Sequence, residues 1–167
     1  SSPQSTDLPA YLDSDDTIWL GHGGAYRFDG NSFVLYTEDD GLVSNNVRSI
    51  MRDRDGAIWF GTNSGVSRYI EKAFTNFSQK DGLPSENIGS ILGMPDGSIW
   101  FDKTHYSDGR FAELKGVPGQ RVAQRDRSGG IWFLGGGATL YNDGNFINLR
   151  EEQGLVASGV SDLIQTR

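Results

Sequence analysis

The chain has 167 residues, which is long enough for one domain with a hydrophobic core. Its 23 Gly and 19 aromatic residues (9 Phe, 6 Tyr and 4 Trp) favour many short strands joined by tight turns and exclude a helical bundle. The net charge of −7 disfavours nucleic acid as a partner, and no apolar run is long enough for membrane insertion by this segment. Because Cys is absent, disulfides, thiolate catalysis and Cys-ligated metals are excluded.

A repeat organises the sequence around its four Trp residues, which stand at positions 19, 59, 100 and 132 and are therefore 40, 41 and 32 residues apart. Each Trp follows an Ile and precedes Leu or Phe, and an Asp- and Gly-containing turn comes before each motif. Further along, the segments 24–28, 65–69 and 137–141 align without gaps, each beginning with Gly and ending with an aromatic residue. One register shared by three units establishes the repeat.

The second unit shows the predicted strands best, at 46–51, 57–60, 65–69 and 74–77. Four short antiparallel strands repeated about every 40 residues are typical of propeller blades. The predicted fold class is therefore all-β, a β-propeller of about four blades with four antiparallel strands each. The predicted divisions are a disordered segment, four blades and an extra innermost strand, at 1–6, 7–39, 40–80, 81–117, 118–152 and 159–167.

Four blades followed by one more innermost strand predict part of a larger propeller or a ring closed by oligomerisation. Three arrangements remain open: a piece of a longer propeller, a four-bladed ring closed by the last strand, and two chains that complete one another. An open array leaves unpaired edges that favour association. We therefore expect as partner either another copy, in a homo-oligomer, or the missing remainder of the propeller.

Two stretches also carry a family resemblance. Asp-Gly-Leu at 40–42 leads into the turn and Trp motif at 53–62, and Asp-Gly-Leu at 81–83 leads into the equivalent motif at 96–101. Together they resemble the two-component regulator propeller repeat, over nearly the whole chain. The resemblance implies a periplasmic sensor propeller of a bacterial membrane receptor, often a hybrid histidine kinase, and many such receptors respond to oligosaccharides.

On this resemblance we expect a non-catalytic module for sensing, ligand binding or protein interaction, located in the periplasm or outside the cell. Its expected ligand is an oligosaccharide or another small extracellular molecule. In propellers, the connection between blades (d–a) and the connection between the second and third strands (b–c) emerge on one face, where ligands commonly bind. The candidate ligand-binding residues are His22, Asn45, Asn46, Thr62, Asn63, Ser85, Glu86, Lys103, His105 and Tyr106. The alternative interpretation is that the Asn and Ser residues among them only shape turns.

The third unit departs from the repeat. Asp102 replaces the Gly found at position 61, and the b–c connection is predicted to shrink to residues 103–106. One interpretation is a blade with eroded outer strands, and the other is a loop redirected beside a binding face.

Catalysis has little support in the sequence, so we expect no enzyme activity, no catalytic residue, no cofactor and no metal. There is no nucleophile-elbow or triad motif, and the paired carboxylates Asp39 and Asp40 recur with a turn. His22 and His105 are predicted to lie in equivalent connections and could face one another. The enzyme alternative is therefore a metal-dependent propeller lyase resembling virginiamycin B lyase, and the remaining alternative is a purely structural scaffold propeller.

Overall fold

The computed structural model describes residues 8–13, 16–117, 121–149 and 160. Within these residues the chain forms sixteen strands in four antiparallel sheets of four strands each. In every sheet the strands follow one another in chain order, so that each sheet is one meander. The all-β propeller architecture expected from the repeat is confirmed.

Each sheet is one blade. The first blade contains β1 (Ala10–Leu12), β2 (Ile18–Gly21), β3 (Ala25–Phe28) and β4 (Phe33–Tyr36). The second blade contains β5 (Val47–Arg52), β6 (Ile58–Thr62), β7 (Val66–Ile70) and β8 (Ala73–Phe77). The third blade contains β9 (Ile91–Gly93), β10 (Ile99–Phe101), β11 (Thr104–Ser107) and β12 (Arg110–Glu113). The fourth blade contains β13 (Arg121–Arg125), β14 (Ile131–Leu134), β15 (Ala138–Asn142) and β16 (Asn145–Leu149).

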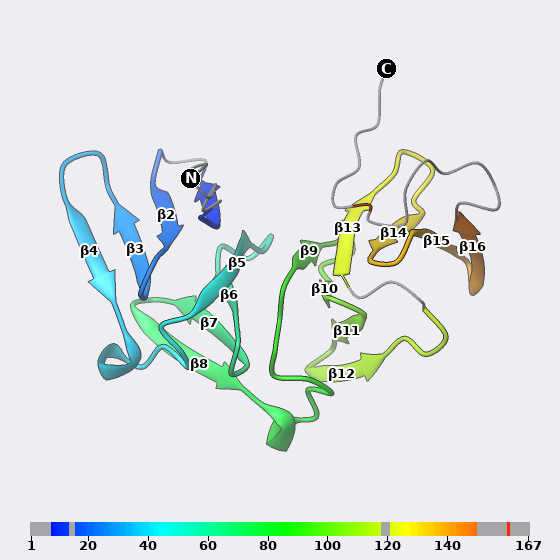
Figure 1. The fold of residues 1–167 in the computed structure, drawn as a ribbon. Helices are drawn as coiled ribbons and strands as arrows, with labels where there is room; N and C mark the ends of the chain where they lie inside the picture. The colour runs from blue at the N-terminus through cyan, green and yellow to red at the C-terminus, as the bar shows by residue number, and fades with distance from the viewer. Residues whose placement is uncertain (1–7, 14–15, 118–120, 150–159, 161–167) are drawn as a thin grey trace, which may run out of the picture.

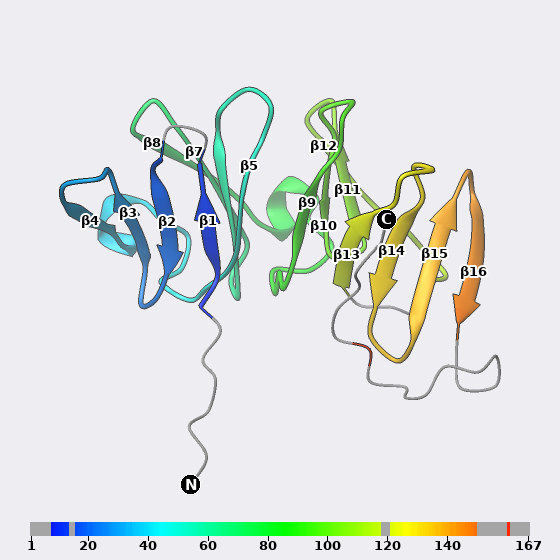
Figure 2. The ribbon, with the colours of Figure 1, turned by 90° about the horizontal axis from the view of Figure 1, so that it is seen from above.

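The four blades fan out around a common axis (Figure 1). Their innermost strands lie next to one another, because β1 contacts β5, β5 contacts β9 and β9 contacts β13. The strands of each blade then follow outward in order, as the turned view shows (Figure 2). The fan is an arc, with the first blade at one end and the fourth at the other.

A Trp from each of the first three blades packs into the following blade. The Trp19 ring lies 5.3 Å from both Phe60 and Tyr69 of the second blade. Trp59 lies 5.4 Å from Phe101 and 5.5 Å from Tyr106 of the third blade. Trp100 repeats the contact with the fourth blade. The repeat therefore places its largest side chains between blades, where each removes about 150–250 Å² from water.

The turn before each Trp motif explains the Asp found there. Asp53 Oδ1 accepts the backbone N–H groups of Asp55 and Ala57, and its Oδ2 accepts the indole N–H of Trp59 at 2.7 Å. Asp126 and Trp132 form the same bond at 3.0 Å in the fourth blade. One carboxylate thus fixes both the β-hairpin turn and the orientation of the Trp ring.

Two single-turn 3₁₀ helices lie in the d–a connections, at Glu38–Asp40 and Gln79–Asp81. Each is closed by a capping box, in which Thr37 pairs with Asp40 and Ser78 pairs with Asp81. The paired carboxylates Asp39 and Asp40 thus belong to such a turn.

The prediction for the third-blade connection was wrong in its extent. The b–c connection is only Asp102 and Lys103, because β11 begins at Thr104. Asp102 adopts a φ of 50°, a left-handed conformation that Asp tolerates better than most residues and that a two-residue hairpin requires. His105 and Tyr106 therefore belong to a strand.

The predicted disordered segment 1–6 and nearly all of the predicted strand 159–167 lie outside the described residues. The proposed blade limits remain predictions.

Candidate functional site

The b–c and d–a connections of adjacent strands meet at one end of the blades. Ser44, in the connection before β5, donates its hydroxyl to Asn63 Oδ1 in the b–c connection of the same blade, at 2.8 Å. The amide of Ile88, before β9, donates to the carbonyl of Thr62 at 2.8 Å. Backbone bonds of this kind join the second and third blades and hold the connections in place around the axis.

Two neighbouring concavities open beside the start of the innermost strands. The first axial concavity has a volume of about 710 Å³. Its lining residues are Leu8, Pro9, Gly21, His22, Gly23, Asn45, Asn46, Val47, Arg48, Gly89 and Arg121. The second axial concavity has a volume of about 570 Å³. Its lining residues are Arg48, Pro84, Ser85, Asn87, Ile88, Gly89, Phe101, Asp102, Lys103, Thr104, Glu113 and Arg121.

The structure brings five of the ten candidate residues to these concavities. His22, Asn45 and Asn46 line the first, and Ser85 and Lys103 line the second. The two concavities share residues 48, 89 and 121. Amide, hydroxyl, imidazole and ammonium groups from the first three blades therefore converge on one region near the axis.

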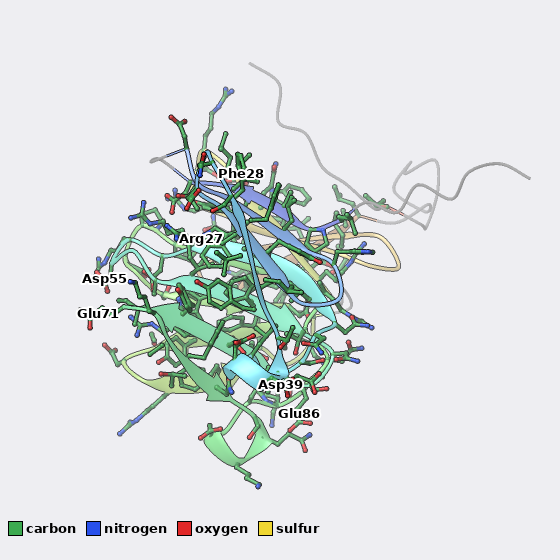
Figure 3. All side chains as sticks on the ribbon, turned by 90° about the vertical axis from the view of Figure 1, so that its left-hand side faces the viewer. Arg27, Phe28, Asp39, Asp55, Glu71 and Glu86 are labelled. Atoms are coloured by element: carbon green, nitrogen blue, oxygen red, sulfur yellow. The ribbon has the colours of Figure 1, made fainter. Side chains whose placement is uncertain are left out.

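Three other candidates lie elsewhere. Thr62 is fully buried and donates its hydroxyl to the carbonyl of Gly65 at 2.9 Å. Asn63 accepts the hydroxyl of Ser44 and shapes the connection. Glu86 accepts the backbone N–H of Gln79 at 3.3 Å. Figure 3 shows Glu86 near Asp39 toward the lower end of this view, with Phe28 toward the top.

The last two candidates are strand residues. The ring of His105 lies 4.9 Å from that of Trp100 and lines a separate concavity farther out in the blade. Tyr106 packs 4.7 Å from Phe111 among the aromatic residues between the second and third blades. His22 and His105 therefore do not occupy equivalent connections, since His22 is in a loop at the first axial concavity.

Two arginines that the sequence analysis did not select stand at the centre of the region. Arg48 donates Nε to Asn46 Oδ1 at 3.3 Å and Nη1 to Asn87 Oδ1 at 2.6 Å. Arg121 begins β13 and lies against Gly89. The repeat does contain a sequence signal for these arginines. Positions 8, 48, 89 and 121 each precede the Trp of their own blade by eleven residues, so they are equivalent positions of the repeat.

Asp102 occupies the wall between Gly89 and Arg121. Its Oδ2 accepts the amide of Gly89 at 2.9 Å and its Oδ1 accepts the hydroxyl of Ser90 at 2.8 Å. Burial raises the pKa of Asp102, while those bonds and the charge of Arg121 act in the opposite direction. Next to it, Lys103 Nζ lies 2.8 Å from Glu113 Oε1, and this pairing lowers the pKa of Glu113.

The described residues contain no cluster of three or more His, Asp or Glu side chains arranged to hold a metal ion. No helix within the described part of the chain has the length and apolar character needed to cross a membrane.

Comparison with known proteins places this architecture in a class. The chain superposes on the extracellular domain of BT3049 from B. thetaiotaomicron, described as a hybrid two component system, with a TM-score of 0.81. The two are 24% identical, and the match covers 96% of this chain and 25% of that one. The extracellular domain of BT4673 from the same organism gives a TM-score of 0.74 at 20% identity, covering 97% and 25%. The fold is that of β-propeller blades.

A family model matches one part of the sequence. The family model of the two component regulator propeller matches residues 41–64, which run from the d–a connection through the Trp59 motif. Residues 41–64 therefore carry the two component regulator propeller repeat, and the resemblance recognised from the sequence is confirmed. This chain spans about a quarter of the length of the two extracellular domains named above.

Virginiamycin B lyase from Staphylococcus aureus shares the fold as well, with a TM-score of 0.63 at 15% identity. That match covers 86% of this chain and 55% of the lyase. No curated protein matches the chain.

Proposed function

We propose that this chain is a non-catalytic, ligand-sensing propeller segment of a bacterial receptor of the two component regulator type. The observation that carries the proposal is the pair of axial concavities, where polar side chains from different blades converge. Concavities of about 300–1,000 Å³ with a few placed polar groups are the usual form of a small-molecule site.

The ligand class follows from the chemistry of the lining. Amides of Asn45 and Asn46, the imidazole of His22 and the hydroxyl of Ser85 both donate and accept hydrogen bonds. A saccharide presents many hydroxyl groups that need such partners. We therefore take an oligosaccharide as the ligand, and the periplasm or cell exterior as the location, because the structurally similar domains above are extracellular.

Thermal unfolding in the presence of soluble glycans tests this function. A ligand at a hundredfold excess over its Kd stabilises the folded state by about 2.7 kcal/mol. Stabilisation of this size produces a readily measured rise in melting temperature. The variant Asn46→Ala should abolish the shift, whereas the control Asn31→Ala, an exposed Asn in the β3–β4 turn, should retain it. No stabilisation by any member of a broad glycan panel would contradict the sensing function.

The enzyme alternative rests on the fold shared with virginiamycin B lyase. Its test is binding of Mg²⁺ or Mn²⁺, measured by calorimetry, in the wild-type chain and in the double variant His22→Ala/His105→Ala. We expect no difference between the two proteins, since these residues line separate concavities. Metal binding that disappears in the double variant would favour the lyase.

A second role, protein interaction, is supported by the two end blades. The open face of the first blade, formed by Tyr26, Phe28 and Phe33, leaves Phe33 60% exposed. The open face of the fourth blade, formed by Trp132, Leu140 and Ile147, leaves Ile147 56% exposed. These are the two complementary halves of the interface that recurs between blades within the chain.

We propose that a second copy of this chain covers these faces, placing Trp132 of one copy against the first blade of the other. Light scattering across a concentration series should then give a dimer. Phe33→Glu should yield a monomer, while Val34→Glu, which alters the opposite face of the same strand, should not. A monomer at every concentration would contradict self-association and would leave further blades of a longer chain as the occupant.

A further inference from the structure

One position of the repeat recurs beside the axis in all four blades. Residues Leu8, Arg48, Gly89 and Arg121 each stand eleven positions before the Trp of their blade. All four line the first axial concavity. The repeat thus directs an equivalent position of every blade into one space, and two of those positions carry a guanidinium group.

The charge of Arg48 is held in place without being neutralised. Arg48 lies at a β-bulge, because the pairing of β5 with β6 shifts register between Val47 and Ser49. Bulges redirect side chains and are common beside functional sites. The hydrogen-bond acceptors of Arg48 are the neutral amide oxygens of Asn46 and Asn87. Among the described residues, no carboxylate forms an ion pair with Arg48.

Arg121 is positioned by the absence of a side chain at Gly89. A Cβ on Gly89 would stand 3.3 Å from Cδ of Arg121, closer than such atoms usually approach. Gly89 therefore leaves room for the Arg121 side chain beside the axis. The carboxylate near Arg121 is Asp102, which already accepts the amide of Gly89 and the hydroxyl of Ser90.

The first axial concavity is positively charged, whereas the protein as a whole is negatively charged. The whole chain has a net charge of −7, yet the described residues of this lining include two Arg, one His and no carboxylate. In the second concavity, the charge of Lys103 is paired with Glu113, and Asp102 faces Arg121. Arg recognises carboxylate and sulfate oxygens through paired N–H donors, and such bonds are stronger than those between neutral groups.

We propose that the ligand of the axial site is an acidic oligosaccharide, whose carboxylate or sulfate group binds between Arg48 and Arg121. The neutral hydroxyl groups of the sugar then meet Asn45, Asn46 and Ser85 in the adjoining spaces. This proposal rests on the sensing function proposed above and defines the charge of its ligand.

The test compares acidic with neutral oligosaccharides of equal length by calorimetry. The probes are oligogalacturonate for carboxylate, chondroitin sulfate oligosaccharides for sulfate, and xylo-oligosaccharides as the neutral series. We expect binding by at least one acidic probe, weaker binding as NaCl is raised, and no comparable binding by the neutral series. Inorganic sulfate alone serves to separate recognition of the sugar from recognition of an isolated anion.

Three single variants test whether the acidic probe binds at the axial site. Arg48→Gln and Arg121→Gln should each lower the affinity for the acidic probe by about tenfold or more, because each removes charge-assisted hydrogen bonds. Arg110→Gln removes the same charge from the exposed strand β12 and should leave affinity unchanged. All three residues are exposed, so melting temperatures should match the wild type and exclude loss of folding as the cause.

The remaining outcomes separate the two proposals. Binding of neutral but not acidic oligosaccharides would overturn the anionic ligand and leave the sensing function intact. Equal weakening by all three variants would show general attraction to the surface, and would overturn the axial site. If neither series binds, both proposals fail. Sulfate binding as tight as that of the sulfated sugar would show an anion site without saccharide recognition.

Discussion

Replacement of Trp59 by Ala tests how the blades are held together. Trp59 is 1% exposed, stacks on Phe77 at 5.6 Å and contacts Phe101 of the next blade at 5.4 Å. Its indole N–H also donates to Asp53. A Trp buries about 150–250 Å², which at about 25 cal/mol per Å² corresponds to about 4–6 kcal/mol. Since Ala retains part of that area, the expected loss of unfolding free energy is about 3–5 kcal/mol.

Trp132→Ala is the matched control. Trp132 has the same strand position and the same bond to Asp126, but it is only half-buried at the open face of the fourth blade. Urea unfolding followed by far-ultraviolet circular dichroism, at a concentration where the chain is monomeric, should show a smaller loss for Trp132→Ala. The difference between the variants measures packing against a following blade. Equal losses, or a loss below about 1 kcal/mol for Trp59→Ala, would refute the role of the Trp as an inter-blade anchor.

Three further predictions concern individual residues, all measured by urea unfolding. Because the pKa of Asp102 is raised in the folded state, the wild type should lose stability relative to Asp102→Asn as pH rises from about 3 to about 7. Gly61→Ala should cost about 1–3 kcal/mol, since the new Cβ would stand 2.7 Å from Cγ2 of Ile88; no measurable cost would show that Ile88 is not held tightly against this position. Burial and the Tyr36 hydroxyl raise the pKa of Tyr69 to about 12. Stability should therefore fall between about pH 10 and about pH 12, and fall less in Tyr69→Phe.

The sequence predicted the elements well because the repeat displays the same pattern several times. In the second unit the predicted strands agree with β5 to β8 within one or two residues. Prediction was weakest where a unit is irregular. The two-residue connection at Asp102 was not foreseen, because a left-handed Asp that tightens a hairpin has no distinctive sequence signal.

The candidate site was predicted from fold analogy and therefore only in part. His22, Asn45 and Asn46 reach the first axial concavity, since connections at that end of the blades do gather near the axis. Thr62 points into the protein and Tyr106 into an inter-blade core, because alternation along a strand decides which side chains face outward. Fold analogy points to the loops, whereas Arg48 and Arg121 belong to innermost strands, so the analogy does not single them out.

By itself, the sequence determined the repeat, the four-stranded unit and the Trp residues that hold the blades together. These are local and periodic properties, fixed by side-chain alternation and turn chemistry, and they recur in every unit. Only the tertiary structure decided that positions 48, 89 and 121 share one space, that Gly89 makes room for Arg121, and that Trp132 is left at an open face. The reason is geometric. Residues separated by many positions in the chain become neighbours only when the blades have been placed around their axis.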